Sequence, residues 1–305
     1  MPHSHQRRDP TSETRATPRW VVRATAVAVA LAGGLVLGTG LLFAHDFWII
    51  PMSFQVGTNE WIEVRGQTSV KFPTSVSAVT PERVATARVI SATGEERLSD
   101  LSVNEKSLVL RHRPATAGQR VVAVALVTRT SRAASAGLKR YIALEGAPDL
   151  AERYEREGLF SKADSVTQLT TKYAKTVVDV GTAGPRAFSR AAGHPLEFVP
   201  VTDPSAAQVN SDMAIQLLFR GRPLANAHVH AGVAYDGAPK DSATAPKDLA
   251  LVTDADGRVR VPLAHGGVWN VRTLHAAPAE GVTAATWDVH FATLTFRVSS
   301  NARAH

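Results

Sequence analysis

The histidine at position 45 has both the residue type and the position to bind a metal ion. It follows an uncharged apolar run that ends at Ala44, and Asp46 comes next. If a signal peptidase cuts after Ala44, the new chain begins with an α-amine and an imidazole on one residue. Two such nitrogens chelate a divalent transition metal, and tetragonal nitrogen and oxygen ligation suits Cu(II) or Ni(II). Asp46 would add a carboxylate oxygen or an outer hydrogen bond.

A second imidazole is needed to complete a three-nitrogen histidine brace, and two later histidines are candidates. His275 follows the apolar stretch of residues 268–272, and His290 lies three residues after Trp287. Each has the alternative of being a surface or loop histidine without a ligand role. Cleavage at another bond would likewise leave His45 as an ordinary residue at the start of the first strand.

The remaining histidines give weaker signals. His228 and His230 flank Val229, so in a strand both rings would project from one face. A metal could bridge them, but two solvent-facing histidines are the simpler interpretation. His112 and His194 have no partner nearby in the sequence, and we interpret them as structural or surface residues.

The sequence offers no alternative chemistry to histidine and carboxylate. It contains no cysteine, which excludes disulfides and thiolate metal sites. It also lacks the nucleophile elbow, the zinc helix and the phosphate-binding loop that mark common enzyme classes. We therefore predict a binding protein and not an enzyme, with a divalent transition metal as its ligand.

Residues 1–44 have the pattern of a targeting segment. Several arginines precede an apolar stretch from residue 24 to residue 44 that carries no charge. This pattern predicts a signal peptide and a periplasmic or other extracytoplasmic location. The stretch also reaches the roughly 20 residues of a membrane span, so an uncleaved N-terminal anchor is the alternative.

The net charge of +7 gives no reason to expect a nucleic-acid partner. Loss of residues 1–44 would remove five arginines, Asp9 and Glu13, which leaves a net charge of +4. The remaining basic residues are scattered among acidic ones and form no continuous basic stripe. We expect membrane contact only through a partner or through an uncleaved anchor.

Short apolar stretches separated by turn residues predict that residues 45–138 form a β-sandwich. These stretches are residues 61–64, 88–90, 107–110 and 120–127. The last of them is apolar at almost every position, as expected for a central strand.

Residues 139–180 have a different pattern and predict a helical excursion. Asp149 and Glu152 have the spacing of a capping box for a short helix that ends near Gly158. A second helix is predicted from apolar residues at helical spacing. These are Val166, Leu169, Tyr173 and Val177.

Glycine and proline are frequent in residues 181–204, which predicts an irregular crossover linker. Residues 205–300 then return to apolar stretches of strand length and predict a second β-sandwich. These stretches are residues 213–219, 227–234, 257–261, 268–272 and 292–298. The fold class is therefore mainly β, with two sandwich domains and a short helical insertion.

Four segments of the chain resemble a family of periplasmic proteins, classed as a domain of unknown function, that are described as accessory components of nickel and cobalt uptake transporters. These segments are Ala44–Trp48, Lys172–Lys175, Pro195–Pro200 and the stretch from Trp287 to Phe296. The resemblance covers nearly all of the chain after residue 44. It implies two immunoglobulin-like or transthyretin-like sandwiches and metal-linked work outside the cytoplasmic membrane. Members of the family also carry a histidine at the place of His275, whereas an aromatic residue is more usual at the place of His290.

Together these observations predict an exported protein that binds a divalent transition metal, nickel or cobalt, and serves a membrane transporter component. His45 and His275 would capture the ion, with help from His290 and Asp46. One alternative is a non-catalytic sandwich module for interaction or adhesion, in which the histidines are incidental. The other is a copper-binding histidine-brace protein, because Cu(II) exceeds Ni(II) in the usual order of affinities.

Overall fold

The structure, a computed structural model, describes Met1 and residues 46–145, 147–236, 247–281 and 286–299. The chain divides into the units Met1–His45 and Asp46–His305, and the fold described here is that of the second unit. The targeting segment predicted at residues 1–44, and His45 itself, lie outside the described residues. In the part of the chain that the structure describes, no helix is both long enough and apolar enough to cross a membrane.

Strands make up most of the described unit. In the first half they are β1 (Asp46–Pro51), β2 (Gln55–Val56), β3 (Ile62–Ser69), β4 (Val84–Ile90), β5 (Glu95–Arg97), β6 (Leu101–Asn104), β7 (Ser107–His112), β8 (Gly118–Leu126), β9 (Arg129–Ala134) and β10 (Ser165–Val180). In the second half they are β11 (Leu196–Pro200), β12 (Asp212–Phe219), β13 (Arg222–Pro223), β14 (His228–Tyr235), β15 (Leu249–Val252), β16 (Arg258–Pro262), β17 (Gly267–Pro278) and β18 (Thr286–Val298). The α-helices are α2 (Ser135–Leu144) and α3 (Pro148–Arg156), and η2 (Pro81–Arg83) and η3 (Pro204–Ala206) are short 3-10 turns.

The described strands form three sheets. The first has the order β1-β3-β7-β6. The third has β12 at its centre, with β11 on one edge and with β13 and β16 on the other. Between them lies a ten-stranded sheet with the order β15-β14-β17-β18-β10-β8-β4-β5, in which β2 and β9 also pair with β10. The predicted mainly β fold with a short helical insertion is confirmed.

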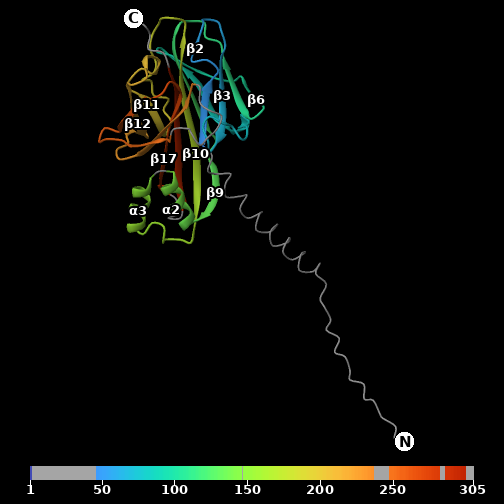
Figure 1. Cartoon of the computed structure of the whole chain (residues 1–305), viewed down its shortest axis with the longest axis vertical. Coiled ribbons are helices and arrows are strands. Elements are labelled where there is room, and N and C mark those ends of the chain that lie inside the picture. The colour runs from blue at the N-terminus through green and yellow to red at the C-terminus, as the bar shows by residue number, and fades with distance from the viewer. Residues whose placement is uncertain (2–45, 146, 237–246, 282–285, 300–305) are drawn as a thin grey trace. The chain divides into compact units, whose positions relative to one another are not determined.

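The long strand β10 connects the two sandwiches, because its side chains alternate between them. Ala174 lies in the core beneath the first sheet, with Phe47 and Leu108. Tyr173 lies in the core beneath the third sheet, with Phe198 and residues of β18. The first and third sheets therefore cover opposite faces of one shared sheet, with β10 running between β3 and the pair β11 and β12 (Figure 1).

The prediction of a second helix is wrong. Residues 165–180 form β10, which pairs with β18 on one side and with β9 and β8 on the other. The apolar residues that suggested a helical face are separated by threonines and followed by further valines. Such β-branched residues favour a strand, here one that pairs with neighbouring strands along both edges. Tertiary pairing thus decided the conformation of a stretch whose apolar spacing was ambiguous.

The first predicted helix is present as α3, which begins at Pro148 and ends at Arg156. The capping box is not formed, because Ala147 is the N-cap and no side chain caps the helix. The helix starts instead with proline at its first position, where the missing N–H leaves no intrahelical bond unmade. Together with α2 it packs on β17 and β18, through Leu138 and Tyr154 against Trp287 and its neighbours.

Candidate functional site

The two later histidines of the predicted site lie opposite each other. His275 of β17 and His290 of β18 are direct partners in an antiparallel ladder whose register is unbroken from Gly267 to Pro278. Their rings both contact Phe219 of β12, with ring centres 4.4 Å away for His275 and 5.5 Å away for His290. The structure therefore brings these two predicted ligands to one place, beneath the aromatic ring of a third strand.

His290 is held in a defined orientation by Tyr173. The tyrosine Oη lies 3.2 Å from Nδ1 of His290, and the two rings are stacked. The imidazole Nε2 is buried and has no hydrogen-bond partner among the described residues. In the tautomer that donates from Nδ1 to Tyr173, this Nε2 carries a free lone pair, which is the form in which imidazole binds a metal.

Both histidines of the pair favour the neutral form. The pKa of His275 is lowered to about 4, chiefly by burial and also by the nearby His290, Arg153 and Arg220. Burial also lowers the pKa of His290, and Asp288 opposes this effect only in part. Neutral imidazoles are ligands for borderline metals such as nickel, cobalt, copper and zinc, and here they require no deprotonation at neutral pH.

His194, which the sequence led us to interpret as a structural or surface residue, packs next to this cluster. Its ring centre lies 5.1 Å from that of Tyr173, and neither of its buried nitrogens has a hydrogen-bond partner in the described parts of the chain. Burial lowers the pKa of His194 to about 4. No local signal marks this residue, because it precedes β11 and reaches Tyr173 only through the packing of the third sheet.

A cation and two carboxylates form the rim of the histidine pair. Arg220 Nη2 lies 3.5 Å from Asp288 Oδ2, and Nη1 lies 3.3 Å from Glu280 Oε2. The guanidinium also stacks on Phe219, at 5.1 Å from the ring centre. Across the described residues, no group of three histidine, cysteine or acidic side chains is arranged to hold a metal ion.

Asp46 lies on the other face of the shared sheet. Its Oδ2 is 3.1 Å from Nε of Arg272, which is three residues before His275 in β17. Since neighbouring residues of a strand alternate between faces, Arg272 and His275 project in opposite directions. The structure therefore brings together His275 and His290 but separates them from Asp46, while His45 lies outside the described residues.

A buried charge network surrounds Asp46. The pKa of Glu145 is raised to about 7, chiefly by burial and also by the negative charge of Asp46. Burial lowers the pKa of Lys172 to about 8, although Asp46 and Glu145 counteract this. Asp46 thus belongs to a group of mutually compensating charges, which explains its position without a metal.

His228 and His230 occupy the strand position that the alternation predicted. Val229 and Ala231 are buried in the core of the second sandwich, and the two histidines are half-buried on the opposite face. His228 Nε2 lies 3.5 Å from Asp149, and His230 is the cross-strand partner of Arg272. Unlike His290, neither ring has a buried nitrogen without a hydrogen-bond partner among the described residues, so this pair is a weaker candidate than His275 and His290.

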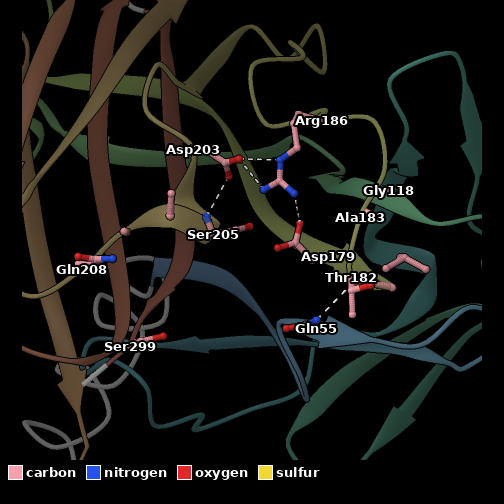
Figure 2. Close-up of a pocket in the computed structure, with 14 residues that line it drawn as sticks. Gln55, Gly118, Asp179, Thr182, Ala183, Arg186, Asp203, Ser205, Gln208 and Ser299 are labelled. Carbon is pink, nitrogen blue, oxygen red and sulfur yellow. Dashed lines mark hydrogen bonds and ion pairs between the residues drawn. The ribbon is translucent and has the colours of Figure 1, made fainter. Parts of the chain in front are cut away.

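A polar cleft lies elsewhere in the molecule, near the end of β10 (Figure 2). It has a volume of about 330 Å³, and it is lined by none of the predicted site residues that the structure describes. Arg186 crosses its wall, 2.9 Å from Asp179 Oδ1 and 2.6 Å from Asp203 Oδ2. Asp179 is eight residues from Thr171, the β10 residue that pairs with His290, so the cleft is roughly 26 Å along the strand from the histidine pair.

The fold defines the chain as a mainly β protein with two sandwiches on a shared sheet. Residues 42–277 match DUF4198, which is described as a domain of unknown function, and the chain belongs to this family. The sequence matches no curated protein.

Several solved structures resemble the chain distantly. The D0-D1 domain of Intimin is 12% identical, over 82% of this chain and 97% of the other, with a TM-score of 0.19. The adhesin InvE of Yersinia pseudotuberculosis is 14% identical, over 85% of this chain and 61% of the other, with a TM-score of 0.21. Alpha-2-macroglobulin of E. coli is 7% identical, over 83% of this chain and 14% of the other, with a TM-score of 0.22. Scores this low carry no argument about function.

Proposed function

We propose that this protein binds a divalent transition metal, nickel or cobalt, through His275 and His290. The observation that carries the proposal is their direct pairing across β17 and β18, with the Nε2 of His290 buried and without a partner among the described residues. A buried polar nitrogen that makes no hydrogen bond is destabilising, so its persistence calls for an explanation. A bound metal ion would satisfy that nitrogen.

The chemistry of the pair agrees with the proposal. Cross-strand partners have Cβ atoms roughly 4.5–5.5 Å apart, a spacing that allows two imidazoles to share one ion. Tyr173 contacts Nδ1 of His290 and leaves Nε2 for the metal, as the outer hydrogen-bond partner of a metal-binding histidine does. Imidazole without thiolate favours nickel, cobalt, copper or zinc over calcium and magnesium.

The metal would be cargo, and the protein would act outside the cytoplasmic membrane in the service of a metal-uptake transporter. Two observations support this part of the proposal: the apolar segment that precedes His45, and the resemblance to proteins described as transporter accessory components. His45 would then add its α-amine and imidazole as a further capture site. Because Asp46 is paired with Arg272 on the opposite face, we assign the central role to His275 and His290.

Titration calorimetry of the purified protein with the chlorides of Ni(II), Co(II) and Cu(II) tests the proposal. We expect one ion to bind per chain and expect His275→Gln and His290→Phe each to weaken binding at least tenfold. His265→Gln is the matched control, because His265 packs on Tyr235 away from the pair. Absence of binding to the wild-type protein, or equal loss in the control, would refute the proposal. The preferred metal follows from the order of the three affinities.

A further inference from the structure

Beside the histidine pair, Arg220 is paired with Asp288, whose side chain projects from the same face of the sheet as the two histidines. Asp288 and His290 are two residues apart in β18, so both side chains project from one face, about 6.6 Å apart along the strand. His275 is the direct partner of His290 and therefore lies diagonally across from Asp288. Diagonal neighbours are roughly 7–8 Å apart, within reach of long side chains.

Two imidazoles and one carboxylate are a common three-ligand set for divalent transition metals. In the structure Asp288 does not complete this set, because its Oδ2 faces Nη2 of Arg220 at 3.5 Å. The same arginine stacks on Phe219, whose ring lies against both histidines. Arg220 therefore pairs with the carboxylate of Asp288 and also packs on Phe219, the ring that contacts both histidines.

Arg220 lies at a backbone position where a long side chain is uncommon, because its φ is positive. With φ values of 50° at Arg220 and 76° at Gly221, these residues form the two-residue turn between paired Phe219 and Arg222. Such turns favour asparagine, aspartate or glycine at the first position, because a side chain is strained at positive φ. A long cationic side chain is not needed to make the turn.

We propose that Asp288 is the third ligand of the metal site and that Arg220 is an internal cation that occupies Asp288 until a metal ion displaces it. This proposal rests on the proposed function of His275 and His290. Binding would exchange the Arg220–Asp288 ion pair for a metal–carboxylate bond, while Arg220 keeps its second partner, Glu280. No covalent bond is made or broken. The exchange weakens the net affinity, as suits a protein that must release its cargo.

The experiment is titration of the protein, expressed from the full chain, with Ni(II) chloride alone. We expect Arg220→Gln to raise the affinity roughly tenfold, because the competing cation is gone, and Asp288→Asn to lower it at least tenfold. In the double variant the gain from Arg220→Gln should vanish, because the released carboxylate no longer exists. Arg222→Gln is the control, since it removes one positive charge from the same exposed hairpin.

The outcomes separate this proposal from the one on which it rests. If wild-type binding depends on His275 but is the same in Arg220→Gln, or is raised equally by Arg222→Gln, the role of Arg220 is refuted and the histidine site stands. If Asp288→Asn binds as the wild type does, Asp288 is not a ligand. If neither the wild type nor Arg220→Gln binds Ni(II), both proposals fail. Thermal unfolding of each variant, monitored by circular dichroism, separates loss of affinity from loss of fold.

Discussion

Nζ of Lys175 lies 2.9 Å from Oε2 of Glu197, and the two side chains are only 1% and 2% exposed. Lys175 comes from β10 and Glu197 from β11, so this ion pair joins the shared sheet to the third sheet. Glu197 also accepts hydrogen bonds from the backbone N–H groups of Ala192 and Gly193. The pair therefore fixes the segment that carries His194 against the histidine cluster.

The first prediction concerns this ion pair. We expect Lys175→Met to lower the free energy of unfolding by roughly 3–5 kcal/mol, because the carboxylate of Glu197 would remain buried without its counter-charge. Urea unfolding at neutral pH measures the change. Arg111→Met is the control, because it breaks the exposed Arg111–Glu63 pair, for which we expect a loss below about 1 kcal/mol. Similar losses in the two variants would contradict the interpretation.

The second prediction concerns acid stability. Burial lowers the pKa of both His194 and His275 from 6.5 to about 4, so below pH 6.5 the unfolded chain binds more protons than the folded chain. Their contribution to stability is complete above pH 6.5 and is lost as the pH falls toward 4, by up to about 3 kcal/mol for each histidine. Urea unfolding between pH 4 and pH 7 measures this loss.

His194→Phe provides the control for the pH experiment. Both ring nitrogens of His194 are buried and make no hydrogen bond within the described residues, so a phenyl ring can replace the imidazole against Tyr173. We expect this variant to be as stable as the wild type at pH 7 and to lose less stability at pH 4.5. An unchanged pH dependence would show that another group causes the acid loss.

The third prediction tests the role of Tyr173 in metal binding. The variant Tyr173→Phe lacks the hydroxyl that contacts Nδ1 of His290, so the imidazole of His290 can adopt either tautomer. We expect roughly tenfold weaker Ni(II) binding with little change in fold. Tyr141→Phe is the control, because Tyr141 packs on Phe291, on the other side of the sheet. Equal affinities in the wild type and Tyr173→Phe would remove Tyr173 from the site.

The fourth prediction tests the proposed export of the chain and its cleavage after Ala44. Mass spectrometry of the protein recovered from the periplasm should give an N-terminus at His45, and His45→Ala should then weaken Ni(II) capture. Asp46→Asn should leave the affinity nearly unchanged and lower the stability, because Asp46 pairs with Arg272 on the face opposite His275. Retention of residues 1–44 would exclude the α-amine as a ligand. A large loss of affinity in Asp46→Asn would return Asp46 to the ligand set.

The amino-acid sequence by itself determined many of the strands and the candidate chemistry of this protein. The apolar run that predicted a central strand is β8, whose residues are all buried, and the alternation around Val229 placed His228 and His230 on one face of β14. These features are local, because the periodicity of apolar side chains reports which faces of a strand are buried. The absence of cysteine similarly left histidine, carboxylate and backbone groups as the candidate metal ligands.

Only the tertiary structure decided which of these residues meet. The long strand β10 has apolar residues at helical spacing, and its pairing with strands on both sides decided its conformation. The register of β17 and β18 placed His275 opposite His290. Because side chains alternate along β17, Arg272 and its partner Asp46 lie on the other face. Register and sheet stacking follow from burying cores contributed by distant segments. No window of sequence contains both sides of such a contact, so the sequence could propose the histidines but could not pair them.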